Sequence, residues 1–307
     1  MRFRCLFAFA VIMPAQIAVA ETVRLQPSSA WVLDYGDNSC RLIRSFGEGE
    51  DKTTLVLESD APDEMDMLAT GKPLANYNAD VSAKFLAAGD KAFEGRSALT
   101  TRDGKPAILW SNVYLVPSPL IEHRVPEYDG HNLKPFVRPA AVSLAEQARY
   151  KERRQQFADK TTELEIQTRW KHSVVLETGS MGKPISMFDK CSRDSLRDWG
   201  VDPNLQDKIV RPAWVLDGSK WFTSDDYPKA MATNGEESEV RIRLIVDASG
   251  KVTKCTSLSH FKYPEFNIVT CNAIMKRASL APAELADGTK VPSYFTQRVV
   301  FRVYYRH

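Results

Sequence analysis

Hydrophobic and polar positions alternate most regularly near the C-terminal end of the 307-residue chain. From Glu239 to Asp247 hydrophobic side chains occupy every second position, and most of the positions between them are charged. This is the period of a half-buried β-strand. Ser249-Gly250 then supplies a tight turn, and residues 252–258 return as the second strand. The pattern predicts a β-hairpin.

A helix and a further strand are predicted after this hairpin. Pro264 occupies the position that favours the start of a helix, and hydrophobic side chains follow it at helical spacing. Pro282 ends this helix and Asp287-Gly288 forms another turn. Alternating hydrophobic residues over 295–303 mark a final strand. The predicted order of elements is therefore β-β-α-β.

This module resembles the C-terminal domain of the TonB family, periplasmic proteins that grip outer-membrane receptors in Gram-negative bacteria. The resemblance covers residues 225–303. The residues that carry it are Tyr227-Pro228, Gly235, Val246-Asp247 with Gly250, Arg277, Pro282-Ala283, Asp287-Gly288 and Phe301. It implies a protein-binding module whose last strand contacts a receptor peptide.

The last strand is accordingly the predicted partner-binding element. A β-β-α-β sheet has an open edge, where unpaired N–H and C=O groups can accept an extended peptide as an added strand. The expected partner-binding residues are Tyr294, Thr296, Gln297, Arg298, Val300 and Arg302. The two arginines would select acidic or polar partners, or they would only keep an exposed edge soluble.

The region from Trp31 to Val116 consists of short apolar or alternating runs, separated by turn signals such as Gly71-Lys72-Pro73 and Asp103-Gly104. Short strands at this spacing are typical of an antiparallel sandwich or barrel. The predicted fold class is α+β: an N-terminal antiparallel β-sandwich or barrel-like domain, followed by the small β-β-α-β module.

Two helices are predicted between these parts. Ser143 and Glu146 form a capping box before the first, and the second runs from Lys183 to Trp199 with Gly200 as its cap. The segment GSMGKPISMFDKC at residues 179–191, with the strands before it, is distantly similar to the invasion-associated locus B family of periplasmic β-proteins.

Residues 1–20 predict a secretory signal peptide, with Arg2 and Arg4 as its basic start and Ala18-Val19-Ala20 as a small-residue cleavage pattern. The alternative is a membrane anchor, but the apolar run is too short to span and Pro14 interrupts it. The predicted organisation is a signal peptide at 1–20, a β-rich domain with a C-terminal helix at 21–200, a linker at 201–220 and the TonB-like module at 221–307. Periplasmic localisation follows from this reading, without stable membrane insertion after cleavage.

Charge argues against one class of partner. The formal net charge is +2, and loss of Arg2 and Arg4 brings it to zero, with acids and bases interspersed. A chain of this kind has no electrostatic basis for binding nucleic acid.

Four cysteines remain after signal cleavage: Cys40, Cys191, Cys255 and Cys271. In an oxidising compartment an even number favours disulfides. Cys255 lies on the second strand of the hairpin and Cys271 on the helix that packs against it, so these two are expected to pair. Cys40 is then left with Cys191. Metal binding or a thiol nucleophile is the alternative, but the sequence has no Cys-x-x-Cys and no closely spaced pair of histidines.

The sequence offers no recognised catalytic motif, neither a Gly-x-Ser-x-Gly elbow nor a His-Glu-x-x-His, and no cofactor is predicted. We therefore expect a soluble periplasmic binding or adaptor protein, not an enzyme, whose partner is a protein such as an outer-membrane receptor peptide. Two alternatives stay open. One is a TonB-type energy transducer whose N-terminal anchor is not cleaved. The other is a periplasmic enzyme with an unrecognised site.

Overall fold

The computed structural model describes residues 22–36, 38–75, 81–86, 93–100, 104–120, 138–167, 173–258 and 264–303. These residues form strands and helices in the mixture expected of the α+β class, so the predicted class is confirmed. The signal peptide predicted at 1–20 lies outside the described residues. Within the described part of the chain, no helix has the length and apolar character needed to cross a membrane.

The N-terminal part is built on a ten-stranded sheet with the order β1-β10-β9-β6-β7-β8-β5-β4-β3-β2. Its strands are β1 (Thr22–Leu25), β2 (Val32–Tyr35), β3 (Cys40–Phe46), β4 (Thr53–Ser59), β5 (Asp66–Gly71), β6 (Val81–Phe85), β7 (Phe93–Thr100), β8 (Pro106–Trp110), β9 (Leu164–Gln167) and β10 (Ser173–Leu176). Short 3-10 turns η1 (Gly49–Asp51) and η2 (Lys72–Leu74) lie between strands. All pairs are antiparallel except β1 with β10. A sandwich or barrel-like arrangement stays a prediction.

Alternation of side chains explains how this sheet builds its core. Along β4 every second residue is fully buried, and Leu55 and Leu57 meet Leu42 and Met67 of the neighbouring strands. Trp110 on β8 is fully buried and donates a hydrogen bond to the carbonyl of Val81, 3.3 Å away. Burial of such side chains is the main source of stability for a sheet of this kind.

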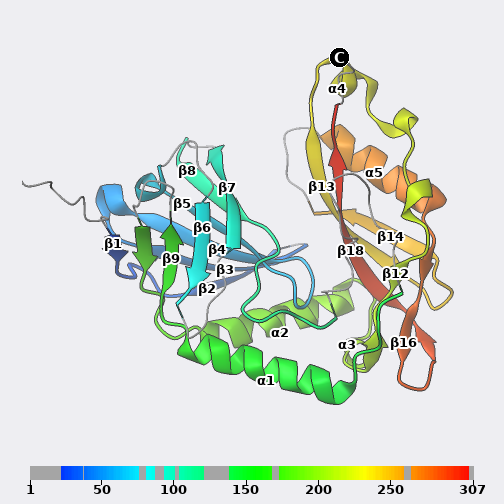
Figure 1. Ribbon diagram of the computed structural model, residues 1–307, viewed down its shortest axis with the longest axis horizontal. Helices are drawn as coiled ribbons and strands as arrows, with labels where there is room; N and C mark the ends of the chain where they lie inside the picture. The colour runs from blue at the N-terminus through cyan, green and yellow to red at the C-terminus, as the bar shows by residue number, and fades with distance from the viewer. Residues whose placement is uncertain are drawn as a thin grey trace, which may run out of the picture.

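Two helices, α1 (Leu144–Lys160) and α2 (Gly182–Asp198), lie beside the sheet and extend toward the C-terminal module (Figure 1). One half of the predicted capping box is present, since the Ser143 hydroxyl accepts a hydrogen bond from the Glu146 N–H. On α2, Ile185 and Phe188 are buried in the sheet's core. The two helices thus run from the N-terminal sheet to the C-terminal module (Figure 1).

The C-terminal module contains β13 (Ser238–Val246), β14 (Val252–Ser257), α5 (Pro264–Arg277) and β18 (Ser293–Phe301). Its sheet has the order β14-β13-β18, and all pairs are antiparallel. The alternating hydrophobic residues of β13, which are Val240, Ile242, Leu244 and Val246, are buried with Phe266 and Ile274 of α5. One face of the sheet is therefore covered by the helix.

Short elements that the sequence pattern did not predict complete this module. They are β15 (Leu280–Ala281), β16 (Ala283–Leu285), β17 (Lys290–Val291), α4 (Lys229–Thr233) and η4 (Ser224–Asp226). The predicted linker also carries structure: α3 (Pro203–Gln206), β11 (Ile209–Arg211), β12 (Trp214–Val215) and η3 (Gly218–Lys220). Because β11 pairs with β16 and β12 with β15, this segment is joined to the module. The domain boundaries themselves remain predictions.

Both predicted disulfides are confirmed. Cys40 of β3 is bonded to Cys191 of α2, with their Cα atoms 6.1 Å apart. Cys255 of β14 is bonded to Cys271 of α5, with a Cα separation of 5.5 Å. The first bridge fastens the helix to the N-terminal sheet, and the second fastens α5 to the hairpin beneath it.

Candidate functional site at the edge strand and the domain interface

β18 is an edge strand. It pairs with β13 along its whole length, from Ser293 opposite Val246 to Phe301 opposite Ser238. Among the strands that the structure describes, none pairs with its other edge. The strand predicted to bind a partner therefore has one side open.

The direction of the main-chain groups can be worked out from β13. The carbonyl of Arg241 accepts a hydrogen bond from the Leu258 N–H, at 2.9 Å, so it points to the β14 side. In an antiparallel ladder the N–H and C=O of one residue point to the same side, and residues opposite each other alternate between bonded and non-bonded pairs. Arg298, which lies opposite Arg241, therefore directs its N–H and C=O toward the open edge.

The same alternation holds for every second residue of the strand. Tyr294, Thr296 and Val300 share this outward direction with Arg298. The Gln297 side chain donates to the Arg298 carbonyl at 3.0 Å, as expected for an outward carbonyl. Thus four of the six predicted partner-binding residues carry the main-chain groups of the open edge. They are Tyr294, Thr296, Arg298 and Val300.

The first half of β18 is held by the N-terminal domain. Tyr294 is 7% exposed, packs edge-on against Trp199 of the α2 C-terminus with ring centroids 5.9 Å apart, and donates through its hydroxyl to the Pro62 carbonyl. The Thr296 hydroxyl is hydrogen-bonded to Glu64. These two side chains, predicted to face a partner, contact residues 62–64 of the same chain, and their contact with a partner stays a prediction.

The second half is more open. Val300 is 47% exposed, and Gln297 and Arg298 are partly buried. Arg298 forms an ion pair with Glu239 at 3.1 Å, and Arg302 forms one with Glu237. Both arginines are therefore neutralised within the module, and an acidic partner would have to compete with these glutamates.

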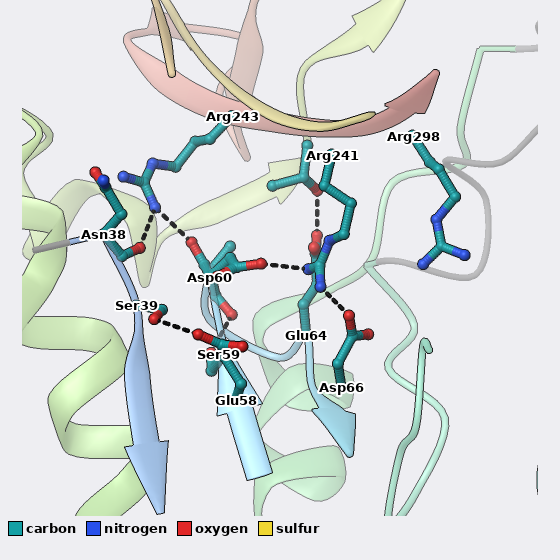
Figure 2. Close-up of polar contacts among 12 residues, drawn as sticks. Asn38, Ser39, Glu58, Ser59, Asp60, Glu64, Asp66, Arg241, Arg243 and Arg298 are labelled. Carbon is teal, nitrogen blue, oxygen red and sulfur yellow. Dashed lines mark hydrogen bonds and ion pairs between the residues drawn. The ribbon is translucent and has the colours of Figure 1, made fainter. Parts of the chain in front are cut away.

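Beside β18, two arginines of β13 enter a cluster of acidic residues (Figure 2). Arg241 lies 2.8 Å from a carboxylate oxygen of Asp60 and is also ion-paired with Asp66. Asp66 in turn accepts a hydrogen bond from the Asn112 N–H at 2.9 Å. All these acidic side chains belong to the N-terminal domain, so the contact joins two parts of the chain that are far apart in sequence. Figure 2 shows Arg298 directed away from this cluster.

Arg243 is more deeply buried, with 2% of its surface exposed. It donates to the carbonyls of Asn38, at 3.0 Å, and Asp60, at 2.7 Å. Its guanidinium lies over the ring of Trp199, 3.5 Å from the centroid. Such stacking suits a guanidinium, which is planar and weakly hydrated. Arg243 and Trp199 thus anchor the middle of the interface.

Burial shifts the pKa values of two charged side chains in this interface. Burial raises the pKa of Asp60 to about 7, and Glu58, Asp66 and Glu64 add to the rise although Arg241 opposes it. Burial also lowers the pKa of Arg243 to about 10. Removing these charged groups from water costs free energy, and their hydrogen bonds and ion pairs offset that cost.

Sequence reasoning missed this interface. Alternation placed Arg241 and Arg243 on the polar side of β13, where a solvent-exposed face was the simplest interpretation. One signal was available: the run ESDAPDEMD at residues 58–66 contains five acidic side chains, more than a turn requires. The contact between this acidic run and two arginines about 180 residues later could not be predicted without the fold.

A pocket of about 370 Å³ lies at the beginning of β18, between α1, α2 and α3. Basic side chains line it, but they are already paired: Arg154 with Asp189 at 2.8 Å, and Lys151 and Arg193 with Asp207. The described residues contain no group of three or more His, Cys, Asp or Glu side chains that could hold a metal ion.

Comparison with known families agrees with the geometry of this module. Residues 224–303 match the family of the Gram-negative bacterial TonB protein C-terminal. The resemblance predicted from the sequence is confirmed for this segment, which is about a quarter of the chain. Domains of the TonB C-terminal family mediate protein–protein interactions in the cell envelope. No curated protein matches the sequence.

Proposed function

We propose that this protein is a periplasmic binding or adaptor protein that contacts an envelope partner by β-strand addition to β18. One observation carries the proposal. In a module of the TonB C-terminal type, the last strand has an open edge with outward N–H and C=O groups. Main-chain hydrogen bonds along such an edge supply affinity for an extended segment.

The accessible stretch of the edge determines what kind of partner fits. It runs from Gln297 to Arg302, because the residues before it are held by the N-terminal domain. The outward groups of Arg298 and Val300 fall within it. A short extended segment suits this edge, with a small or apolar side chain beside the exposed Val300.

The periplasmic location rests on the signal-like residues 1–20 and agrees with two disulfides, which persist in oxidising compartments. An energy transducer would instead need its N-terminal segment as a membrane anchor. The N-terminal residue of the protein isolated from cells distinguishes the two, since a chain that still begins at Met1 favours the transducer.

The test is a proline on the open edge. Val300→Pro removes an N–H that points away from β13, so the module should stay folded while partner binding is lost. The matched control is Val300→Thr, which changes the side chain but keeps the N–H donor. The full mature protein is used to capture partners from periplasm and outer membrane, with bound proteins quantified by mass spectrometry. If folded Val300→Pro captures the same partners as wild type, strand addition at this edge is wrong.

A further inference from the structure

The sheet of the C-terminal module has two faces, and only one belongs to the module's own core. α5 covers the face that carries Val240, Ile242 and Leu244. The opposite face carries Arg241, Arg243 and Ile245 of β13 with Tyr294 and Thr296 of β18, and the N-terminal domain covers it. Ile245 is 9% exposed and packs with Tyr294, Trp199 and Ala61.

This second contact is chemically different from the helix contact. Apart from the small cluster around Trp199, it consists of ion pairs and hydrogen bonds, and most of them involve Arg241 or Arg243. Buried ion pairs contribute little net stability, because the cost of removing the charges from water offsets their attraction. Interfaces between domains that are polar in this way are expected to open more readily than an apolar core.

The contact also lies against the partner-binding strand. A strand added beside Tyr294 and Thr296 would project side chains onto the covered face, where residues 62–64 already contact both side chains. The added strand and the N-terminal domain therefore compete for this half of β18. Beyond Gln297, Arg298 and Arg302 form ion pairs with Glu239 and Glu237 of the module itself.

We propose that residues 58–66, with Asn38 and Trp199, form a latch that covers the outer face of the module and limits a partner to the second half of β18. When the latch opens, the outward main-chain groups of Tyr294 and Thr296 join those of Arg298 and Val300. The usable edge then becomes about twice as long. The consequence for binding rests on the proposed function, whereas the opening itself does not.

The opening is measured without any partner, by hydroxyl-radical footprinting of the full mature protein. Arg241→Glu replaces the cation that pairs with Asp60 and Asp66 by another carboxylate and should open the latch. We expect oxidation of Trp199 and Tyr294 to rise severalfold. Trp110 and Trp221, which are buried in the two separate cores, should stay at the wild-type level.

The matched control is Arg298→Gln, on the strand position opposite Arg241 and on the same sheet face, whose ion pair lies within the module. It should leave the footprint of Trp199 and Tyr294 unchanged. Asp66→Lys, on the N-terminal side of the contact, should reproduce the effect of Arg241→Glu. If Trp110 or Trp221 also becomes reactive in Arg241→Glu, that variant has unfolded, and the result for Asp66→Lys then tests the latch. The latch is wrong if Trp199 and Tyr294 are oxidised only to the wild-type level in a variant that stays folded. It is also wrong if Arg241→Glu and Asp66→Lys both unfold throughout.

A second measurement connects the latch to binding. Asp66→Lys should capture severalfold more of the envelope partners than wild type, because more of the edge is available. Unchanged or weaker capture by an opened variant contradicts the competition. Failure of the proposed function looks different: Val300→Pro then leaves capture unchanged, while the footprint of the latch variants still changes.

Discussion

At the scale of single residues, the interface shows how position changes the chemistry of an ordinary side chain. Asp60 follows directly after β4, in the turn that connects β4 with its neighbour β5, and it is 5% exposed. It shares Arg241 with Asp66 and has Glu58 and Glu64 close by. Two arginines meet several carboxylates there, so one carboxyl group is favoured in its neutral form near neutral pH.

The free energy of unfolding should therefore fall as pH rises. The folded-state pKa of Asp60 is about 7, above its ordinary value of 3.8. Between these values the folded protein binds a proton that the unfolded chain has lost, so this contribution is complete at low pH and is lost through pH 7. The slope approaches about 1.4 kcal/mol per pH unit. Urea unfolding of wild type and Asp60→Asn between pH 5 and pH 8 measures it, and the variant should lack this slope.

A second aspartate provides the control. The hydrogen bond from Arg277 lowers the pKa of Asp226, so its stabilising contribution is present above its ordinary pKa and is lost only under acidic conditions. Asp226→Asn should reduce stability by the same amount at each pH from 5 to 8. If Asp60→Asn retains the full wild-type slope, the assignment to Asp60 is wrong.

At the scale of elements, the β13–β14 hairpin shows why a local signal can be reliable. Asp247 begins the turn, and its carboxylate accepts hydrogen bonds from the N–H groups of Ser249, at 2.8 Å, and Lys251, at 3.0 Å. Gly250 has a φ of +89°, a region that favours glycine. Its carbonyl also accepts from the Leu280 N–H, so the turn is pressed against β15.

Two glycines with similar φ allow backbone strain and close approach to be separated. A Cβ at Gly250 would lie 2.0 Å from the Leu280 carbonyl oxygen, whereas a Cβ at Gly288, with φ +84°, would meet nothing within 4 Å. We expect Gly288→Ala to cost about 1 kcal/mol from strain alone. Gly250→Ala should cost clearly more, because β15 must also move. Urea unfolding measures both, and equal losses would contradict the close approach.

Local patterns predicted most of the long elements, and long-range contacts explain what they missed. The hairpin, α1, α2, α5 and β18 follow from periodicity, caps and turn residues within a few positions. β11 and β12 have only three and two residues, and they exist because β16 and β15 lie beside them. The candidate strand was found through its family-like sequence, but the covering of Tyr294 and Thr296 depends on residues more than 200 positions away.

At the scale of the whole molecule, residues 201–220 contact both parts, and β11 and β12 pair with strands of the second part. Val215 of β12 and the neighbouring Ala213 are fully or almost fully buried in the core of the C-terminal module. The same segment also reaches back to the first part, since the Val210 carbonyl accepts from the Val142 N–H at 2.7 Å. Both contacts restrict how far the module can move when the latch opens.

The last prediction concerns where the module begins. A fragment 221–307 matches the boundary suggested by the sequence, but it lacks β11, β12 and the side chains of Ala213 and Val215. Burial of a valine alone contributes about 1.5–3 kcal/mol. Loss of the strands also leaves hydrogen-bonding groups of β15 and β16 unpaired. A fragment 201–307 should therefore unfold at distinctly higher urea concentration than 221–307, with the Cys255–Cys271 disulfide intact in both. Equal midpoints would show that the module begins at residue 221, and an unfolded 201–307 fragment would show that it depends on the N-terminal domain.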